Sequence, residues 1–454
     1  MELAVNKSIR ISSGTNVILV SATIIGAWWV LGHNAVWIYG FSYAYHALNL
    51  QAFLFRRSNP ESFMVQAILF RTVAFILLGC LLVPYLVFGL NHLAVAVILI
   101  GTLLHISAFS ALGFKKTYYG TELTRQKHRI VEAFPYDRLQ HPMVLGSLLQ
   151  FSGLYFLVPQ FTQAYPFLVV GHLILSILTA VIEHFDLHFK DYFFTSIKGS
   201  FSASDRVETI DWIRDWSIKQ FQDDLRAECS MHRYIKTLPG ETCLKIDAIR
   251  YADEVMQPIR HAFPQSRIVP LPMTDEIYIS RYNIDRGGDQ GLFDRHHDGN
   301  LRFMPGASVV RSLLYLSSED NLEIVFDTSG MKFNMKTYDF GLLDFHKELH
   351  WVNGSYDPEK PPRILLKCNY YVDHVGYAPY RWLGISLNVA VFYCVKVAME
   401  YSKSPKTYLQ KLVGSLCNIV RQLNNLNPAA PVALLFLLVV VSMKVILLQI
   451  GNNN

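Results

Sequence analysis

Long apolar stretches alternate with polar segments over the first 190 residues. A stretch of about 20 mostly apolar residues is long enough to cross a bilayer as a helix. No Asp, Glu, Lys or Arg lies between Arg10 and Arg56, which leaves room for one or two spans. Four further apolar stretches follow, at Met64–Leu90, His92–Leu112, Pro142–Val158 and Tyr165–Ile182. The pattern predicts a multi-pass α-helical membrane bundle.

From Lys190 to about Val375 the pattern changes to mixed charges, turn residues and short alternating apolar runs. Alternation with a period of two is typical of β-strands. Upstream of these runs, Asp205–Met231 has helical spacing, and we expect its apolar side chains in a core. Strands are expected at Glu276–Tyr282, Val309–Leu316, Phe340–Phe345 and Arg363–Val372, with a hairpin of Leu322–Phe326 and Met331–Met335.

The last part of the chain returns to apolar segments. Leu383–Val395 is apolar but too short to cross a bilayer, so we expect an interfacial or docking helix. Asn424–Pro431 has the composition of a linker, and Val432–Ile450 is expected to be a C-terminal transmembrane helix. The sequence thus predicts four parts, at residues 1–195, 196–375 (with a core at 270–375), 376–430 and 431–454.

Composition supports a membrane protein. Hydrophobic residues make up 51% of the 454 residues and charged residues 17%, against about 25% charged in soluble proteins. Six cysteines are too few for a disulfide scaffold, and this hydrophobicity excludes a disordered chain. The net charge of +5 does not require a nucleic-acid partner, and we expect none. We interpret the first apolar run as an anchor rather than a cleaved signal.

Positive residues predict the orientation of the chain. Short cytosolic loops of membrane proteins are enriched in Lys and Arg. Arg56 and Arg57 lie in one such loop, and the segment between residues 114 and 140 holds six more cationic residues. This pattern favours a cytosolic polar domain on an internal membrane such as the endoplasmic reticulum. A lumenal orientation stays open, since the Asn-Gly-Ser sequence at Asn353 can be glycosylated only there.

Polar side chains at the predicted membrane boundary form the first candidate site. Arg129 and His141 flank the start of one predicted span, and Glu183 lies at the end of the next. Ionisable groups at a membrane boundary are costly unless they have partners, so they indicate function. These three side chains are expected to converge in one pocket. Ordinary interfacial anchoring is the alternative.

The same region resembles phosphatidylethanolamine N-methyltransferase and its isoprenylcysteine methyltransferase relatives. The resemblance covers roughly residues 90–195. It implies S-adenosyl-L-methionine as cofactor and a lipid or lipid-like acceptor in the membrane. It also implies cofactor-binding or catalytic roles for the residues that match the family motifs. These are Gly113, Gly120, Arg129, Phe134-Pro135-Tyr136, His141-Pro142-Met143, Gly146, Glu183 and His184.

A second candidate site lies in the strand-rich region. His296 and Asp298 are two residues apart, so at a strand end their side chains lie on the same side. His350 would supply a second imidazole from a neighbouring strand. Two imidazoles and one carboxylate with open positions are the ligand set of non-haem Fe(II) oxygenases. Arg363 starts the next strand, where its guanidinium suits the distal carboxylate of a 2-oxo-dicarboxylate.

Alternatives remain for each ligand. His297 could replace His296, and His346 could replace His350. Zinc could bind the same ligand set. A barrel whose histidines occur by chance is a further alternative.

This region resembles the Fe(II)/2-oxoglutarate-dependent dioxygenases of the prolyl 4-hydroxylase type. The residues that carry the resemblance are Arg281-Tyr282, His296, Asp298, the segment Tyr338–Phe345, His350, Val352 and Arg363. The resemblance implies a double-stranded β-helix (jelly-roll), with iron and 2-oxoglutarate as cofactors and ascorbate as an optional addition. It also implies that Tyr282 contacts 2-oxoglutarate.

The sequence therefore predicts a membrane-bound bifunctional enzyme that methylates and hydroxylates one lipid-like or membrane-associated substrate. Two alternatives stay open. In one, only the dioxygenase works and the helices are an anchor. In the other, both halves are degenerate and the protein is a lipid-binding scaffold.

Overall fold

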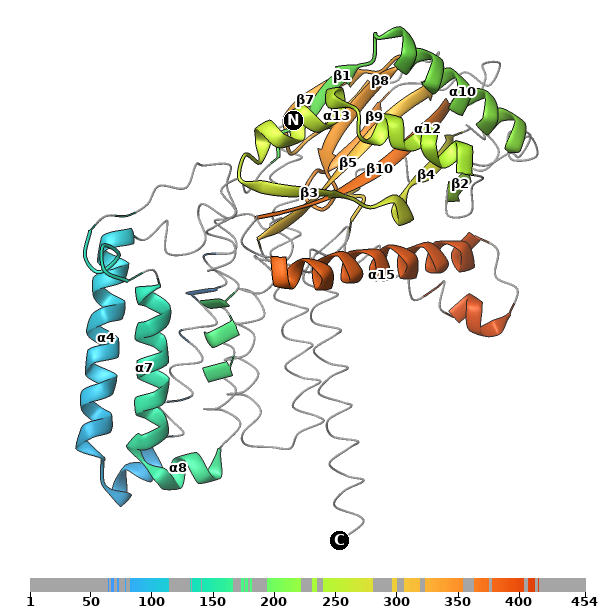
Figure 1. Cartoon of the computed structure of the whole chain (residues 1–454). Helices are drawn as coiled ribbons and strands as arrows, with labels where there is room; N and C mark the ends of the chain where they lie inside the picture. The colour runs from blue at the N-terminus through green and yellow to red at the C-terminus, as the bar shows by residue number, and fades with distance from the viewer. Residues whose placement is uncertain are drawn as a thin grey trace. The chain divides into compact units, whose positions relative to one another are not determined.

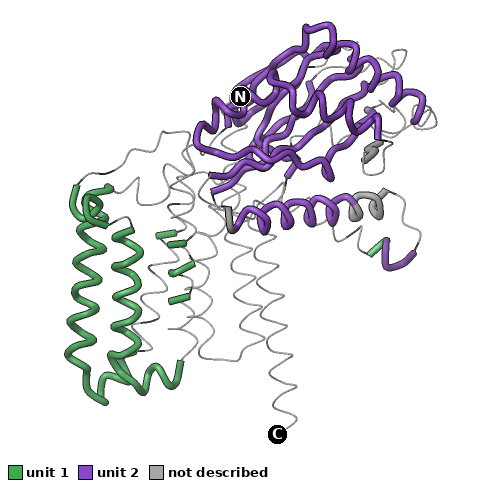
Figure 2. The backbone as a smooth tube through the Cα atoms, in the orientation of Figure 1, with its two compact units in different colours: residues 1–187, 411–454 green, residues 188–410 purple. Residues whose placement is uncertain are grey.

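The computed structural model describes most of two regions of the chain. The described residues are 83–113, 133–139, 141–165, 194–221, 231–234, 240–280, 296–299, 306–318, 323–353, 363–374, 378–403 and 407–412, with single residues at 131 and 415 and scattered ones in 64–82 and 173–181. The chain divides into two compact units, residues 1–187 with 411–454 and residues 188–410 (Figure 2). The domain boundaries expected from the sequence stay a prediction.

The first unit is helical in its described part. Helix α4 (His92–Leu112) and helix α7 (Pro142–Leu157) lie side by side, with η1 (Val83–Phe88) and α8 (Pro159–Ala164) near their ends (Figure 1). Helix α4 begins where the Asn91 side chain accepts hydrogen bonds from two backbone amides of the first turn.

Among the described helices, α4 alone is long and apolar enough to cross a membrane, and α7 is apolar but shorter. These two helices match two of the expected apolar stretches closely. The stretches expected at 11–55 and 432–450 lie outside the described residues, and those at 64–90 and 165–182 are described only in part.

Glycines bring α4 and α7 into close contact. A Cβ atom on Gly101 would lie 2.7 Å from the Gly146 carbonyl oxygen, and one on Gly153 would lie 2.9 Å from the Ala94 carbonyl oxygen. Small residues permit such close approach between apolar helices. Across the same contact Gln150 donates a hydrogen bond to the Thr102 hydroxyl at 3.0 Å.

The second unit contains two antiparallel sheets. The larger has the order β1-β8-β5-β10-β4-β2, with β3 pairing to β10, and the smaller has the order β7-β6-β9 (Figure 1). The strands are β1 (Ile197–Ser200), β2 (Met231–Tyr234), β3 (Ser266–Pro270), β4 (Glu276–Ser280), β5 (Ala307–Ser317), β6 (Glu323–Phe326), β7 (Met331–Asn334), β8 (Asp339–Asp344), β9 (His350–Asn353) and β10 (Arg363–His374).

The larger sheet packs differently on its two faces. On one face Ile364, Leu366 and Val372 of β10 pack in a core with helices α10 (Ser204–Gln220), α12 (Gly240–Arg250) and α13 (Asp253–Ala262). On the other face Leu365 joins a second core with residues of β6 and β9. Because strand side chains alternate, the odd-numbered β10 residues line the space between the two sheets.

Several sequence expectations are confirmed in this unit. Strands β4, β5, β8 and β10 match the expected segments, and β6 and β7 form the expected hairpin. The expected helix over Asp205–Met231 is wrong at its end. Helix α10 ends at Gln220, and Met231 begins β2, which pairs with β4. Strands β1 and β3 were not expected, since both are short and partly exposed.

Candidate metal centre

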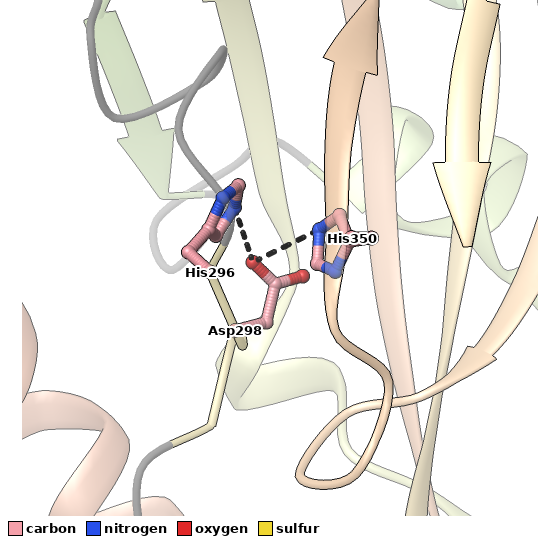
Figure 3. Close-up of side chains that lie close together, drawn as sticks. All are labelled: His296, Asp298 and His350. Carbon is pink, nitrogen blue, oxygen red and sulfur yellow. Dashed lines mark ion pairs between the residues drawn. The ribbon is translucent and has the colours of Figure 1, made fainter. Parts of the chain in front are cut away.

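Three side chains converge where the two sheets meet. The His296 and His350 Nε2 atoms lie 3.7 Å and 3.8 Å from the Asp298 Oδ1 atom (Figure 3). One ligand atom from each residue lies within 4.8 Å of the others. Two ligand atoms at about 2.1 Å from one ion are about 3.0–3.5 Å apart. The observed separations are therefore close to those of a metal site.

Backbone pairing explains why distant residues meet here. His296 forms an antiparallel bridge with His350, the first residue of β9, through two backbone hydrogen bonds of 3.0 Å. The bridge brings the two imidazole centroids to 4.4 Å. Asp298 follows two residues later and reaches the same side.

The hydrogen bonding and protonation of His350 suit a metal ligand. Its Nδ1 atom lies 3.2 Å from the Glu348 carbonyl oxygen. Because a carbonyl only accepts, Nδ1 carries the proton and the Nε2 lone pair faces Asp298. Burial and the neighbouring His296 lower the pKa of His350 to about 4. The imidazole is therefore neutral at pH 7.

Asp298 is held ionised by Arg311. Burial raises the pKa of Asp298, but the charge of Arg311, helped by His350, outweighs burial and holds the pKa well below its usual value. The Arg311 Nη1 atom donates to Asp298 Oδ2 at 2.9 Å, which leaves Oδ1 facing the imidazoles. Arg311 is fixed in turn, since its Nε donates to the Asn369 Oδ1 atom at 2.9 Å.

A second chain of charged groups lies beside Arg311 on the same face of the sheet. The Lys367 Nζ atom lies 3.2 Å from Glu276 Oε1 and 4.4 Å from the centroid of the Tyr278 ring. Arg311 Nη1 lies 3.7 Å from the same Glu276 oxygen. The space between the sheets is therefore polar next to the triad.

Arg363 is buried, and the described part of the chain offers it no anionic partner. Its side chain is among the largest fully buried ones, yet its guanidinium nitrogens have no hydrogen bond to any described residue. The nearest described aromatic ring is that of Tyr315, with its centroid 5.6 Å from the guanidinium carbon. A buried charge left unpaired is strongly destabilising. This guanidinium therefore fits an anionic ligand.

The alternative ligands lie outside the cluster. Among the described residues, the cluster that could hold a metal contains neither His297 nor His346. The His346 Nε2 atom lies 3.3 Å from the Asn388 Oδ1 atom of helix α15 (Ala378–Lys403). Tyr282 lies outside the described residues.

The predicted methyl-transfer site is described only in part. Gly113 ends α4 with a φ of 78°, a conformation that favours glycine. His141 precedes α7, and Pro142 is the buried first residue of that helix. Gly120, Arg129, Glu183 and His184 lie outside the described residues, so the convergence expected for this site stays a prediction.

Sequence reasoning missed Arg311 and the groups beside it. A signal was present, because a single arginine interrupts the apolar run Val309–Leu316, and Lys367 interrupts Arg363–Val372 in the same way. A charged residue inside a strand buried on both faces must have a polar partner. That rule could have pointed to both residues.

The comparisons with known proteins treat the helical part and the strand-rich part of the chain separately. The family described as phospholipid methyltransferase matches residues 90–193. No curated protein matches the sequence.

Solved structures match the other part of the chain. The collagen prolyl hydroxylase of Paramecium Bursaria Chlorella virus-1, in its 2OG complex, is 16% identical over 40% of this chain and 97% of its own, with a TM-score of 0.26. A Pseudomonas putida prolyl-4-hydroxylase is 14% identical over 42% and 96%, with a TM-score of 0.27. A Phytophthora capsici prolyl 4-hydroxylase is 12% identical over 59% and 92%, with a TM-score of 0.29. These values leave the chemistry of this chain to be inferred from its own residues.

Proposed function

We propose that residues 196–375 form an Fe(II)- and 2-oxoglutarate-dependent oxygenase with a double-stranded β-helix fold. Two observations carry the proposal: the approach of His296, Asp298 and His350 to one another, and the buried guanidinium of Arg363, which has no hydrogen bond to any described residue. Two facing antiparallel sheets, with the cluster between them, support the fold.

The described residues fit the proposed cofactors. Two imidazole nitrogens and one carboxylate oxygen leave open positions on a six-coordinate metal, as Fe(II) oxygenases require. Zinc could bind the same donors, but a zinc site does not explain the buried Arg363. Arg363 would form paired hydrogen bonds with the distal carboxylate of 2-oxoglutarate.

Each residue then has a defined task. His296 and His350 would hold the metal through Nε2, and Asp298 would hold it through Oδ1. Bound Fe(II) and 2-oxoglutarate would supply the hydroxylation of a C–H bond by dioxygen, with 2-oxoglutarate converted to succinate and CO₂. Tyr282 is proposed to contact 2-oxoglutarate, and ascorbate is an optional addition.

For the helical part we propose methyl transfer from S-adenosyl-L-methionine to a lipid or lipid-like acceptor within a multi-pass membrane bundle. The family match over residues 90–193 supports this proposal. The proposed site contains Gly113, Gly120, Arg129, His141, Pro142, Glu183 and His184. The protein is placed in an internal membrane such as the endoplasmic reticulum, with the oxygenase in the cytosol.

The two activities are proposed to act on one substrate. Linking two modules raises the effective concentration of one module's product at the other to roughly millimolar. The substrate would then contain both a methyl acceptor and a hydroxylated C–H bond. The alternative is an oxygenase whose helical part is a non-catalytic anchor. The clustering of His296, Asp298 and His350 favours this alternative over a degenerate lipid-binding scaffold.

The oxygenase is tested by the conversion of 2-oxoglutarate to succinate in the purified full chain supplied with Fe(II). We expect turnover in the wild type and its loss in His296→Ala. In Arg363→Met we expect the KM for 2-oxoglutarate to rise at least tenfold, because a charge-assisted pair worth about 1.5–3 kcal/mol is lost. Equal turnover in all three proteins would contradict the proposal.

The shared substrate is tested by lipid and metabolite profiling of cells that carry His296→Ala or Glu183→Ala. We expect Glu183→Ala to remove a methylated product and His296→Ala to remove its hydroxylated form. Loss of unrelated products would contradict a common substrate. Loss of a product in His296→Ala alone would favour the oxygenase with an anchor.

A further inference from the structure

Helix α15 contacts the domain through both polar and apolar side chains. Arg381 is buried, and its Nε donates to both carboxylate oxygens of Asp373, at 3.0 and 2.9 Å. Asn388 also faces the domain, where its Oδ1 lies 3.3 Å from His346 Nε2. These polar side chains of α15 face the domain beside Ile385, which packs against a buried apolar cluster of the domain.

The outward face of α15 exposes large apolar side chains. Trp382 is 76% exposed and Leu383 is 53% exposed. Ser386, Ala390 and Cys394 are also exposed and follow at intervals of three and four residues, so they continue one stripe along the helix. None of these five residues is charged. We call Trp382, Leu383, Ser386, Ala390 and Cys394 the outer stripe.

We propose that the outer stripe docks residues 188–410 onto the interfacial region of a lipid bilayer. Trp is enriched at the boundary between headgroups and hydrocarbon, where an amphipathic helix lies parallel to the membrane. Moving the apolar side chains of this stripe from water into a membrane is favourable. No charged group of the stripe has to be desolvated in the process.

Neighbouring residues support a bilayer rather than a protein as the partner. A few residues beyond α15, Tyr408 and Leu409 are 82% and 68% exposed. The sequence there contains Lys403, Lys406 and Lys411, which suit anionic headgroups. The chain also contains α4, which is long and apolar enough to cross a membrane. The length and composition of α4 are thus consistent with a bilayer as the partner.

Docking through α15 would bring the candidate metal centre close to the membrane. Asn388 of the helix contacts His346. His346 in turn packs on Gly299, where a Cβ atom would lie 2.3 Å from His346 Nδ1. Gly299 directly follows Asp298. The His346 side chain and the Gly299 backbone connect helix α15 to the triad, which suits a substrate taken directly from the bilayer; this last step rests on the proposed oxygenase function.

Two exposed cysteines provide a matched test. Cys394 lies on the outer stripe, and Cys243 lies on α12. We would prepare two full-length variants in nanodiscs of phosphatidylcholine and phosphatidylserine. One keeps Cys394 and the other keeps Cys243 as the labelling site, with the remaining cysteines replaced by serine except the buried Cys368. A nitroxide on each would report collisions with apolar O₂ and with a water-soluble nickel complex.

We expect the label at residue 394 to collide preferentially with O₂ and the label at residue 243 to collide preferentially with the nickel complex. Equal nickel access at both positions would overturn the proposal. Protection of residue 394 from both reagents would also overturn it, since it would show that protein covers the stripe.

A second pair of variants tests the stripe itself. Trp382→Glu is expected to raise nickel access at residue 394, whereas Leu244→Glu, at a 70% exposed position on α12, is expected to leave it unchanged. Both replacements lie at exposed positions, so neither should disturb folding. Unchanged nickel access in Trp382→Glu would contradict docking. Succinate formation in the same samples reports on the proposed oxygenase separately, because the label measurement requires no turnover.

Discussion

At the scale of single residues, the two carboxylate oxygens of Asp298 have different partners in the candidate metal centre. Arg311 binds Asp298 Oδ2, so Oδ1 is left for the metal. The guanidinium lies 4.4 Å from the centroid of the Phe345 ring and is held by Asn369. Arg311 is therefore a positioning residue, which sets the direction and charge of a ligand without being one.

Replacing Arg311 should weaken metal binding without removing a ligand. In Arg311→Met we expect the affinity for Fe(II), or for Mn(II) used in its place, to fall about 10–100-fold, as for other partners of metal ligands. Metal titration of the purified protein measures this. Arg260→Met, at an exposed arginine of α13, is the control and should bind metal like the wild type. Unchanged affinity in Arg311→Met would show that Asp298 needs no orienting partner.

A second buried carboxylate shapes the turn that leads to His350. Asp344 Oδ1 accepts hydrogen bonds from the backbone amides of His346 and Lys347, both at 3.0 Å, and Oδ2 accepts one from Ser308. Burial raises the pKa of Asp344, but Lys347, with help from His346 and Ser308, outweighs burial and lowers the pKa below its usual value.

This lowered pKa predicts a pH dependence. A carboxylate whose pKa is lower in the folded state stabilises the fold above its unfolded pKa of about 4, and that stability is lost as the pH falls through the folded value. We expect Asp344→Asn to lower the free energy of unfolding by about 3 kcal/mol at pH 7, because the buried ion pair with Lys347 Nζ, 3.5 Å away, is lost. In denaturation of both proteins, the difference should shrink below about pH 4. A difference that is independent of pH would rule out the ionised form of Asp344 as the cause.

At the scale of elements, the α4–α7 contact depends on glycine. Gly146 belongs to the motif that resembles the methyltransferases, yet its role here is steric. A Cβ atom on it would lie 2.8 Å from the Gly101 carbonyl oxygen. The Gly101 carbonyl oxygen belongs to the helix backbone and cannot rotate away as the end of a side chain can. The two helices would therefore have to move apart.

Gly146→Ala should therefore destabilise the helix pair by about 1–3 kcal/mol, as expected for overpacking. Thermal unfolding in detergent, followed by helical circular dichroism, measures the loss. Gly240→Ala is the matched control, since a Cβ atom there would meet nothing within 4 Å. If both variants unfold like the wild type, the close approach is not required.

Elements with strong periodicity could be predicted from the sequence, and the ones that depend on tertiary pairing could not. The largely apolar runs of β5 and β10 predicted both strands nearly to their ends. Strand β2 has only four residues and exists through its pairing with β4, so local pattern predicted a continued helix instead. Helix α15 extends beyond both ends of the expected Leu383–Val395, and its N-terminal extension includes Arg381, whose Nε donates to Asp373.

At the scale of the whole molecule, sequence order predicted which residues could form the site but not what surrounds them. The spacing of His296, Asp298 and His350 suggested neighbouring strand ends, and the structure brings these residues together through one antiparallel bridge. The partners of Asp298 come from β5 and β10, which are adjacent only in the folded sheet. Such a contact leaves no local signal beyond a charge in an apolar run.

The support for a function differs in kind between the two units. The unit of residues 188–410 contains the whole described cluster, with Arg363 and the docking helix. In the other unit the described helices form a packed pair, and the family match covers the segment that contains them. The oxygenase proposal therefore rests on geometry, and the methyltransferase proposal rests on the family match.

The most direct test is anaerobic addition of Fe(II) and then 2-oxoglutarate to the purified full chain. A 2-oxo acid that chelates ferrous iron produces a visible charge-transfer absorption band. We predict one iron per chain and this band in the wild type, neither in His350→Ala, and iron without the band at low 2-oxoglutarate in Arg363→Met. A wild-type protein that binds no iron, or a His350→Ala protein that keeps both iron and band, would contradict the account.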